Sequence, residues 1–367
     1  MYLRELELRN FRNYAAFEGE FSADVQVIVG DNAQGKTNLL EAINLLSTLR
    51  SFRGPASKEM IRFQESAARV RGVVVSGAGT DELSVTISAE GRKATVNEKE
   101  IPVTEYLAVL PSVRFTPDDI LLIKGEGGPR RRALDRAVFG LQPSHLRAIL
   151  EYNRALKHKN ILLKSERTQA DELDVWNQRL AEIGARVVSA RLSFVDRINP
   201  LLAEFFGEIS GTTLSARVRY RGIAEPPRNE EALRLAMLDE LRAKSEDEQR
   251  RGHTLVGPHR DDLGLELDGH SVRRYASQGQ HRMFAVALKV AEIELHNREL
   301  HRYPVLLLDD VKSELDHDRV RYLFGFLNRI PAQTFVTTTD VSELGPELRR
   351  PSAVWRVRAG VAERAGA

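Results

Sequence analysis

The sequence predicts an α/β protein in which a mixed, mainly parallel sheet carries an antiparallel β-subdomain and is interrupted by an inserted, mainly helical second lobe. Two apolar runs, Val25–Val29 and Val305–Leu308, are expected to be strands, and the four consecutive aliphatic residues of the second suit a strand buried on both faces of a parallel sheet. Residues 69–96 hold β-rich runs separated by turns, and residues 130–251 have helical periodicity. Because the helical segment lies between the two apolar runs, we expect it to be inserted between two parts of one sheet.

The first apolar run leads into a loop that matches the phosphate-binding pattern G-x-x-x-x-G-K-[ST]. Glycines at both ends of the loop let successive N–H groups surround a phosphate, and the following segment has the periodicity of a helix. Lys36 would place its charge at the β- and γ-phosphates, and the Thr37 hydroxyl would bind Mg²⁺. The expected ATP-binding residues are Gly30, Asp31, Asn32, Ala33, Gln34, Gly35, Lys36, Thr37 and Asn38.

Composition limits the other possibilities. The chain has 367 residues, of which 42% are hydrophobic and 29% charged, which is typical of a globular protein with up to two domains. It contains no cysteine, so disulfides, thiolate metal sites and a cysteine nucleophile are excluded. A net charge of only +2 means that any DNA-binding surface must be a local patch. No signal-peptide pattern and no long apolar run is found, so we expect a cytoplasmic protein without a membrane segment.

The antiparallel β-subdomain is predicted from the N-terminal third of the chain. Leu6 and Leu8 alternate with charged residues, which suggests an edge strand followed by a turn. The runs 69–76, 82–89 and 92–96 predict a meander of hairpins. A polar stretch with prolines, residues 111–129, ends this pattern.

The helical segment has its own internal pattern. An apolar stripe from Leu180 to Leu202 predicts a long helix that stops near Asn199–Pro200 or soon after, and Asn229 is expected to open another helix. The alternation between residues 214 and 220 predicts a strand between them, and the charged run 244–251 is expected to be a solvated helix end or an exposed loop.

Two later motifs complete a nucleotide site. The second apolar run ends in Asp309 and Asp310; at the carboxyl end of a parallel strand, Asp309 would lie beside Mg²⁺ and Asp310 within reach of an attacking water. Both could instead simply cap the next helix. Ser277 is a good N-cap for the segment that follows it, which would form a second anion site.

These motifs together resemble the ABC-type ATPases of DNA repair and chromosome maintenance, and within them the RecF family. The resemblance covers nearly the whole chain. It is carried by residues 8–14, the loop continuing through 38–43, and the runs 50–53, 256–262, 277–280, 307–310 and 313–316. It implies an ATPase lobe formed by residues 1–115 and 290–367, with Walker A, Walker B and D-loop motifs, and a second lobe formed by residues 116–289, ending in the signature motif.

The resemblance also implies a mechanism. The signature of one subunit would close over the γ-phosphate of ATP held by another, making a head-to-tail homodimer with catalytic residues Lys36, Asp309 and Asp310 and Mg²⁺ ligands Thr37 and Asp309. The signature residues acting in trans would be Ser277, Gln278, Gly279 and Gln280, and the D-loop would be Ser313, Glu314, Leu315 and Asp316. Such a protein would bind gapped, duplex or junction DNA and promote RecA loading with RecO and RecR in recombinational repair, replication restart and the SOS response.

Several residues depart from the wider ABC pattern. Asp310 stands where most members have a glutamate, Gln278 replaces a glycine, and Thr338 or Thr339 takes the place of the switch histidine. No Q-loop glutamine is located near Val113–Phe115. Each change weakens water activation or γ-phosphate sensing, so we expect a weak, DNA-stimulated ATPase that turns over below about 10 s⁻¹.

DNA binding is the least specific of these expectations. Candidate phosphate contacts are Arg50, Arg53, Arg130, Arg131, Arg132, Arg273 and Arg274, although arginine clusters often form only solvated or salt-bridged faces. The run His259–Asp262 reads either as a turn with internal ion pairs or as an element of the interface between heads. Two other functions stay open: an ABC-head ATP switch with a protein partner, and a P-loop kinase.

Overall fold

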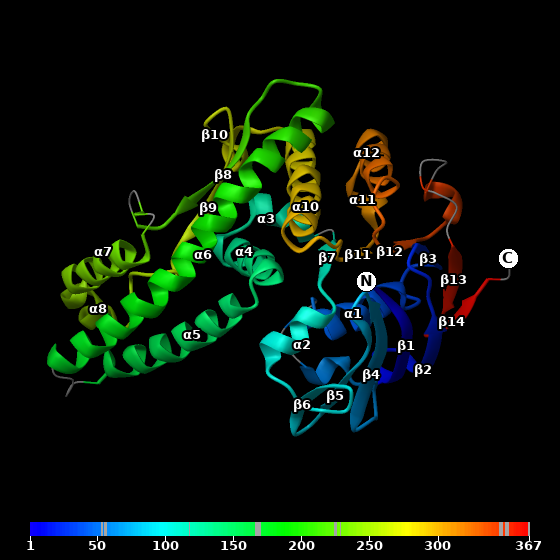
Figure 1. The fold of residues 1–367 in the computed structure, drawn as a ribbon, viewed down its shortest axis with the longest axis horizontal. Helices are drawn as coiled ribbons and strands as arrows, with labels where there is room; N and C mark the ends of the chain where they lie inside the picture. Colours follow the sequence, from blue (N-terminus) through cyan, green and yellow to red (C-terminus); the bar gives the residue numbers. More distant parts are fainter. Residues whose placement is uncertain are drawn as a thin grey trace. The chain divides into compact units, whose positions relative to one another are not determined.

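The computed structural model describes residues 1–52, 54, 57–116, 118–165, 170–223, 226–227, 229–344, 348 and 352–365. Their contacts divide the chain into two compact units (Figure 1). The first unit joins Met1–Ile120 to Arg282–Ala367, and the second is Leu121–His281. Each unit is described by itself below.

The first unit contains a five-stranded antiparallel sheet. Its strands, in spatial order, are β2 (Tyr14–Glu20), β1 (Tyr2–Phe11), β4 (Ala67–Ser76), β5 (Gly79–Ser88) and β6 (Gly91–Val96). The predicted meander is confirmed, because β4, β5 and β6 pair in antiparallel order. The predicted edge position of the first strand is wrong: β1 pairs with both β2 and β4.

A six-stranded sheet forms the other layer of this unit. Its strands, in spatial order, are β14 (Val361–Arg364), β13 (Ala353–Arg358), β3 (Val25–Val29), β12 (Thr334–Thr338), β11 (Val305–Leu308) and β7 (Ser112–Phe115). All neighbours are parallel except β13 and β14. The sheet is therefore mixed and mainly parallel, as predicted, but β7 comes from the proline-bearing stretch where the sequence predicts no strand.

Helix α1 (Lys36–Thr48) lies between the two sheets, where it contacts β1, β4 and β5 of one and β7 and β12 of the other. Figure 1 shows α12 (His317–Leu327) on the other side of the six-stranded sheet. The sheets also meet through aromatic rings: Phe21 on the chain after β2 lies 4.9 Å from Phe335 and 5.2 Å from Trp355, measured between ring centroids. Burial of these large rings contributes to the stability of the unit.

The remaining elements of the first unit are short or peripheral. They are η1 (Ser57–Met60), α2 (Val103–Val109), α11 (Val311–Glu314) and η2 (Val341–Leu344), together with most of α10 (Gln278–Leu300) and the start of α3 (Asp118–Lys124).

The second unit is mainly helical and has one small sheet. Its helices are α4 (Gly127–Leu141), α5 (Ser144–Leu162), α6 (Ala170–Ser210), α7 (Glu230–Ala243), α8 (Ser245–Arg251) and α9 (Val272–Tyr275). The sheet has the order β10 (His270–Ser271), β9 (Asp262–Leu267) and β8 (Ala216–Arg221). Asn229 caps α7 as predicted, since its side chain accepts hydrogen bonds from the N–H groups of Glu231 and Ala232.

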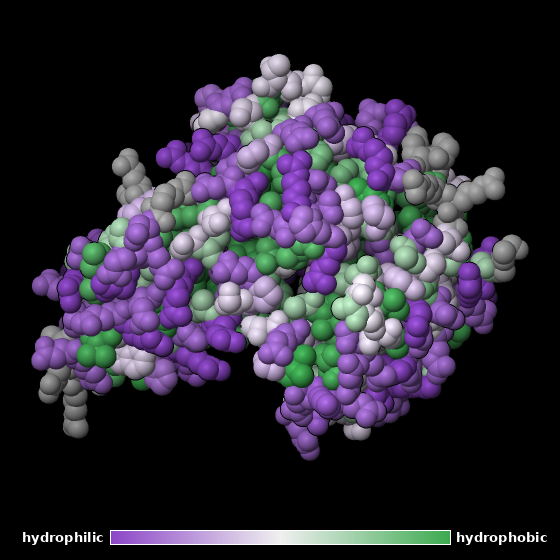
Figure 2. All heavy atoms as spheres, in the orientation of Figure 1, coloured by the Kyte–Doolittle hydropathy of each residue, from purple (hydrophilic) through white to green (hydrophobic). Residues whose placement is uncertain are grey.

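Two sequence expectations fail in this unit. Helix α6 does not stop near Pro200 but continues to Ser210. The charged run that was expected to be solvated includes Glu248, whose carboxylate is buried and pairs with the equally buried ammonium of Lys159 at 2.5 Å. On the face seen in Figure 2, hydrophilic side chains cover most of the outer surface of α5, α6 and α7. In the part of the chain that the structure describes, no helix is both long and apolar enough to cross a bilayer.

Candidate functional site

The loop between β3 and α1 has the backbone of a phosphate-binding loop. Gly35 precedes α1 with φ of 119°, and Ala33 has φ of 63°, so the chain makes left-handed turns before the helix begins at Lys36. A Cβ at Gly30 would collide with the carbonyl oxygen of Val357 on β13, so only glycine fits where the loop leaves the sheet. The first N–H groups of α1 therefore face the concave side of the loop, where an anion is favoured.

Two turns hold the loop in this shape. Asn13, in the turn between β1 and β2, donates from its amide to the Gln34 carbonyl at 2.8 Å and accepts from the Asn38 amide at 2.8 Å. In the turn between β13 and β14, the N–H of Gly360 donates to the same carbonyl at 3.0 Å, and that of Ala359 donates to the Gln34 side chain at 2.7 Å. The loop is thus braced from both sheets.

Below the loop, α1 is fixed by a buried ion pair. The carboxylate of Glu41 is fully buried and accepts two hydrogen bonds from the Arg12 guanidinium, at 2.9 and 2.7 Å, and one from Ser51. Removal of either partner of such a pair would destabilise the fold, because it would leave an uncompensated buried charge. Arg12, Asn13 and Ser51, which belong to the runs that carried the family resemblance, therefore support the loop and its helix physically.

Lys36 closes the loop on itself in this structure. Its ammonium donates to the carbonyl oxygens of Gly30 at 2.6 Å and Asp31 at 2.9 Å. Burial lowers the pKa of this ammonium, although the carboxylates of Asp310, Asp309 and Asp31 oppose the shift. The lysine is placed where it could move from these carbonyls to phosphate oxygens.

The two halves of the expected metal site meet at the end of β11. The Thr37 hydroxyl donates to Oδ1 of Asp309 at 2.9 Å, and the Thr337 hydroxyl donates to the same oxygen at 2.8 Å. Asp310 is exposed, has φ of 47°, and its N–H donates to Thr337. Asp309 is thus aimed at the loop by two hydroxyls, while the Asp310 carboxylate lies at the surface.

The donors present suit Mg²⁺. A hydroxyl and a carboxylate oxygen are hard ligands, and Mg²⁺ usually takes one or two carboxylates together with phosphate oxygens and water. No group of three or more His, Asp or Glu side chains that could hold a metal by itself occurs among the described residues. Thr37 and Asp309 would hold the ion, which would neutralise charge on a bound triphosphate.

Strand β7 brings an element to this site that the sequence did not reveal. The N–H of Asp309 donates to the carbonyl of Phe115, the last residue of β7, at 2.9 Å. The next residue, Thr116, donates from its N–H to the buried carboxylate of Asp119 at 2.7 Å, and that carboxylate also lies 3.5 Å from the Lys289 ammonium on α10. The structure therefore places Thr116 and Asp119 directly after the strand near which no Q-loop glutamine is found in the sequence.

In the second unit, Ser277 caps α10 through a reciprocal pair of hydrogen bonds. Its hydroxyl accepts from the N–H of Gln280 at 3.2 Å, and the Gln280 side chain accepts from the N–H of Ser277 at 2.8 Å. The buried ring of His281 donates to the carbonyl of Val272 at 2.9 Å, which ties the start of α10 to α9. Ser277 and Gln278 are exposed, and Gly279 and Gln280 half-exposed, as an anion-binding helix start requires.

The other expected residues fall in different environments. Leu315 is buried, and Asp316 caps α12 by accepting from the N–H of Arg319. Although burial opposes it, the hydrogen bond from Arg319 lowers the pKa of Asp316. The side chains of Ser313 and Glu314 lie outside what the structure describes. Thr338 ends β12, and its hydroxyl donates to the carbonyl of Asp340.

The arginines expected to contact DNA differ in burial and in their partners. The prediction that Arg130 contacts DNA is wrong. Its guanidinium is buried and donates two hydrogen bonds to Asp262, at 2.8 and 2.6 Å, so it cannot reach a phosphate. Arg131 is half-buried and donates to the carbonyl of Asp261. Arg53 lies outside the described residues. The exposed candidates are Arg50, Arg132, Arg273 and Arg274.

The run His259–Asp262 takes part in a buried polar network. Asp262 pairs with Arg130, Asp261 accepts from the Tyr220 hydroxyl, and His259 accepts from the Tyr152 hydroxyl at 2.8 Å. Burial raises the pKa of Asp261 to about 6 and lowers that of His259 to about 4. The partners lie on α4, β8 and α5, so these polar contacts are not the ion pairs internal to the turn that one interpretation of this run expected.

Comparison with known proteins identifies the family. A model described as "RecF/RecN/SMC N terminal domain" matches residues 2–361. A protein of Geotalea uraniireducens named "DNA replication and repair protein RecF" is 40% identical over 349 residues, which are 95% of each chain. The chain belongs to the RecF family. A RecF of Citrifermentans bemidjiense is also 40% identical, over 98% of this chain and 99% of the relative.

Solved structures agree with this assignment. The structure described as "recombination mediator protein RecF-ATP in RecFOR pathway" superposes with a TM-score of 0.91 at 33% sequence identity. The match covers all of this chain and 98% of that one. A Smc head domain from Pyrococcus furiosus has a TM-score of 0.56 at 18% identity, which shows a common fold alone. The predicted fold, an ABC-type ATPase head, is confirmed.

Proposed function

We propose that this chain is an ATP-dependent DNA-binding protein of recombinational repair and replication restart, in which bound ATP joins two subunits head to tail. The observation that carries the proposal is the meeting of Thr37 and Asp309 at 2.9 Å, at the end of a parallel sheet and beside Lys36. Membership of the RecF family and the solved structure of a RecF with ATP support ATP as the nucleotide.

The proposed dimer uses the signature in trans. Ser277, Gln278, Gly279 and Gln280 of one subunit would contact the γ-phosphate on the loop of the other. The capped start of α10 supports this role, because the first N–H groups of a helix attract an anion most strongly when closure removes water around it. Hydrolysis would remove the contact that favours the closed state and so release the dimer.

We further propose that hydrolysis is slow and stimulated by DNA. Lys36, Asp309 and Asp310 would be the catalytic residues, with Asp310 orienting the water. Its carboxylate is one methylene shorter than glutamate, and a threonine ends β12 where a histidine would sense the γ-phosphate. Turnover would act as a timer for a clamp, with RecO, RecR and RecA as functional partners in the cytoplasm.

Sedimentation with and without ATP, Mg²⁺ and DNA tests the proposal. The wild-type protein should dimerise only when ATP is present, and Lys36→Met should stay monomeric because it cannot hold the phosphates. Ser277→Arg should bind ATP with normal affinity yet fail to dimerise. A wild-type protein that stays monomeric with ATP and DNA would overturn the head-to-tail mechanism, and loss of ATP affinity in Ser277→Arg would show that Ser277 acts in cis.

The same samples distinguish the other candidate functions. An ATP switch with a protein partner would dimerise with ATP but retain no DNA. A P-loop kinase would remain monomeric and transfer phosphate to a small acceptor. No described feature favours either over the proposal.

A further inference from the structure

One face of strand β8 carries three arginines in a row. Along Ala216–Arg221 burial alternates strictly: Ala216, Val218 and Tyr220 are 2%, 3% and 8% exposed, and the arginines between them are exposed. We call Arg217, Arg219 and Arg221 the arginine ladder. Because side chains two residues apart on a strand share a face, the guanidinium groups leave the backbone at steps of about 6.8 Å.

The carboxylates across the strand neutralise this face only in part. In the pairing of β8 with β9, Arg217 lies opposite Glu266 and Arg221 opposite Asp262. Arg221 reaches diagonally over Gly264 to Glu266, with a nitrogen-oxygen distance of 3.3 Å. A Cβ at Gly264 would stand within 2.8 Å of the Arg221 guanidinium carbon, so glycine makes this crossing possible.

Most of the positive charge therefore stays available. The Asp262 carboxylate is engaged by Arg130 on α4. Within the described chain, no carboxylate oxygen lies within 4.0 Å of a nitrogen of Arg217 or Arg219. Exposed arginines without such a partner keep their donors in solvent, where they are well placed to meet an anionic partner.

The edge of β8 is closed to another strand. The Asn199 side chain on α6 accepts from the N–H of Val218 at 2.8 Å and donates to its carbonyl at 3.0 Å, so one amide takes both backbone groups of a residue in the middle of the strand. A peptide that adds to the sheet would have to displace this amide, which favours a partner that recognises the side chains of β8.

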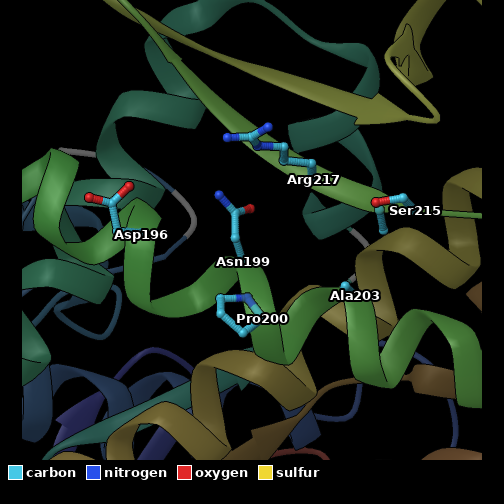
Figure 3. Close-up of a pocket in the computed structure, with 7 residues that line it drawn as sticks. Asp196, Asn199, Pro200, Ala203, Ser215 and Arg217 are labelled. Carbon is cyan, nitrogen blue, oxygen red and sulfur yellow. The ribbon is translucent and has the colours of Figure 1, made fainter.

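Open hollows flank the ladder at both ends. At one end, Arg217 on β8 and Ser215, which precedes the strand, face Asp196 and Asn199 on α6 around a hollow of about 300 Å³ (Figure 3). At the other end, Arg219 and Arg221 line a hollow of about 390 Å³ with Ile223 and Pro226. Figure 2 shows hydrophilic residues gathered over β8 and β10. The arginine side chains thus have free space around them.

We propose that the arginine ladder binds the phosphate backbone of duplex DNA. The inference rests on the proposed DNA binding and names a surface for it that the expected contacts do not include. Guanidinium groups suit phosphates because they donate two parallel hydrogen bonds, and the steps along the strand match those between successive phosphates. Sites for single strands usually add exposed aromatic rings on which bases stack, whereas the one aromatic residue of β8, Tyr220, is buried.

The test is a salt titration of DNA binding by the full chain. Binding of a labelled duplex is measured by fluorescence anisotropy for the wild type and for Arg217→Gln/Arg219→Gln, which spares Arg221 and its pair with Glu266. Loss of two phosphate contacts should lower the slope of log K against log salt by about 1.8 and weaken binding about tenfold, whatever the base sequence. The matched control is Arg147→Gln/Arg154→Gln, which removes two exposed charges from α5 of the same unit.

The outcomes separate this inference from the function on which it rests. If the wild type binds duplex and the ladder variant keeps its affinity and slope, the ladder is not the site although DNA binding stands. If the control loses as much as the ladder variant, only overall charge matters and the assignment falls. A wild type that binds no DNA overturns both proposals. If polyglutamate displaces duplex as well as unlabelled duplex does at equal charge, the ladder serves an acidic protein instead. If single strands of equal length lose more affinity than duplex in the ladder variant, the choice of duplex is wrong.

Discussion

Replacing Asn13 with alanine is expected to weaken ATP binding while leaving the chain folded. Asn13 lies in the turn between β1 and β2, outside the loop that would hold the phosphates. Its amide makes two hydrogen bonds of 2.8 Å, one to the Gln34 carbonyl and one from Asn38. These bonds hold the loop in the shape that presents its N–H groups to an anion.

The magnitude follows from what the loop would lose. A hydrogen bond contributes about 0.5–1.5 kcal/mol net, and two would contribute about 1–3 kcal/mol. The Gln34 carbonyl keeps a second donor, the N–H of Gly360 at 3.0 Å, so the lower part of this range applies. A loss of about 1–2 kcal/mol corresponds to a Kd for ATP that is about 5 to 30 times higher.

Isothermal titration calorimetry with ATP and Mg²⁺ measures this change, and Asn97→Ala is a matched control. Asn97 also makes two turn hydrogen bonds in the same unit, from the N–H of Glu82 and to Asp81, each 2.9 Å long. It lies by the β5–β6 hairpin, at the opposite edge of the antiparallel sheet from β2. The control should lose thermal stability but no ATP affinity. If Asn13→Ala binds ATP as tightly as the control does, the loop does not need this brace.

Three further predictions follow, two for the first unit and one for the buried polar network around Asp261 in the second unit. Thr37→Ala should abolish the Mg²⁺ dependence of ATP binding and Thr37→Ser should restore it, as read by calorimetry with and without the ion, because only a hydroxyl can share the metal with Asp309. Arg12→Ala should lower the free energy of unfolding in denaturant by about 3–5 kcal/mol, since it leaves Glu41 buried and unpaired. Asp261→Asn should change the pH dependence of the free energy of unfolding. Burial raises the pKa of Asp261 to about 6, so the stabilisation that its protonated carboxyl gives is full below pH 4 and is lost as the pH rises past 6. Over that interval the free energy of unfolding of the variant should rise by about 3 kcal/mol relative to that of the wild type.

Each of these has a result that would count against it. Full Mg²⁺ dependence in Thr37→Ala would remove the hydroxyl from the metal site. If Arg12→Ala unfolds at the wild-type denaturant concentration, the pair with Glu41 contributes nothing net. Parallel stability curves for Asp261→Asn and the wild type between pH 4 and 7 would show that the Asp261 carboxyl titrates alike in the folded and unfolded chain.

Local signals predicted the loop, the Walker B strand and several helix starts. Val305–Leu308 is apolar along its whole length and Val25–Val29 at every position but Gln26, and both strands lie inside the parallel part of the sheet with neighbours on either side. Ser277 and Asn229 cap helices because their oxygens satisfy N–H groups at the first turn, an interaction that spans only three residues. Signals of this kind need no knowledge of the rest of the fold.

Other features depend on distant parts of the chain and were missed. Strand β7 has only four residues and follows Pro111, so its place in the sheet comes from pairing with β11, nearly two hundred residues later. Helix α6 continues through Pro200 because its apolar stripe is buried along the second unit, which outweighs the single hydrogen bond that proline cannot make.

Charged residues show the same dependence on tertiary partners. Arg130 and Glu248 look solvated in sequence, and only Asp262 and Lys159, brought near by folding, make them internal. The brace on Gln34 is a similar case, since Asn13 and Gly360 lie at opposite ends of the chain. No local pattern marks a residue whose partner is chosen by the fold.

Complementation between two inactive variants tests the composite site most directly. Lys36→Met and Ser277→Arg, each unable to hydrolyse ATP alone, are mixed and assayed for DNA-stimulated hydrolysis. In a head-to-tail pair, one site of each mixed dimer combines an intact Lys36 with an intact Ser277. Neither variant dimerises with itself, so every dimer in the mixture is a mixed one with one intact site of two, and up to about half of the wild-type rate should return. A mixture as inactive as its components, under conditions in which the wild type dimerises, would contradict the account.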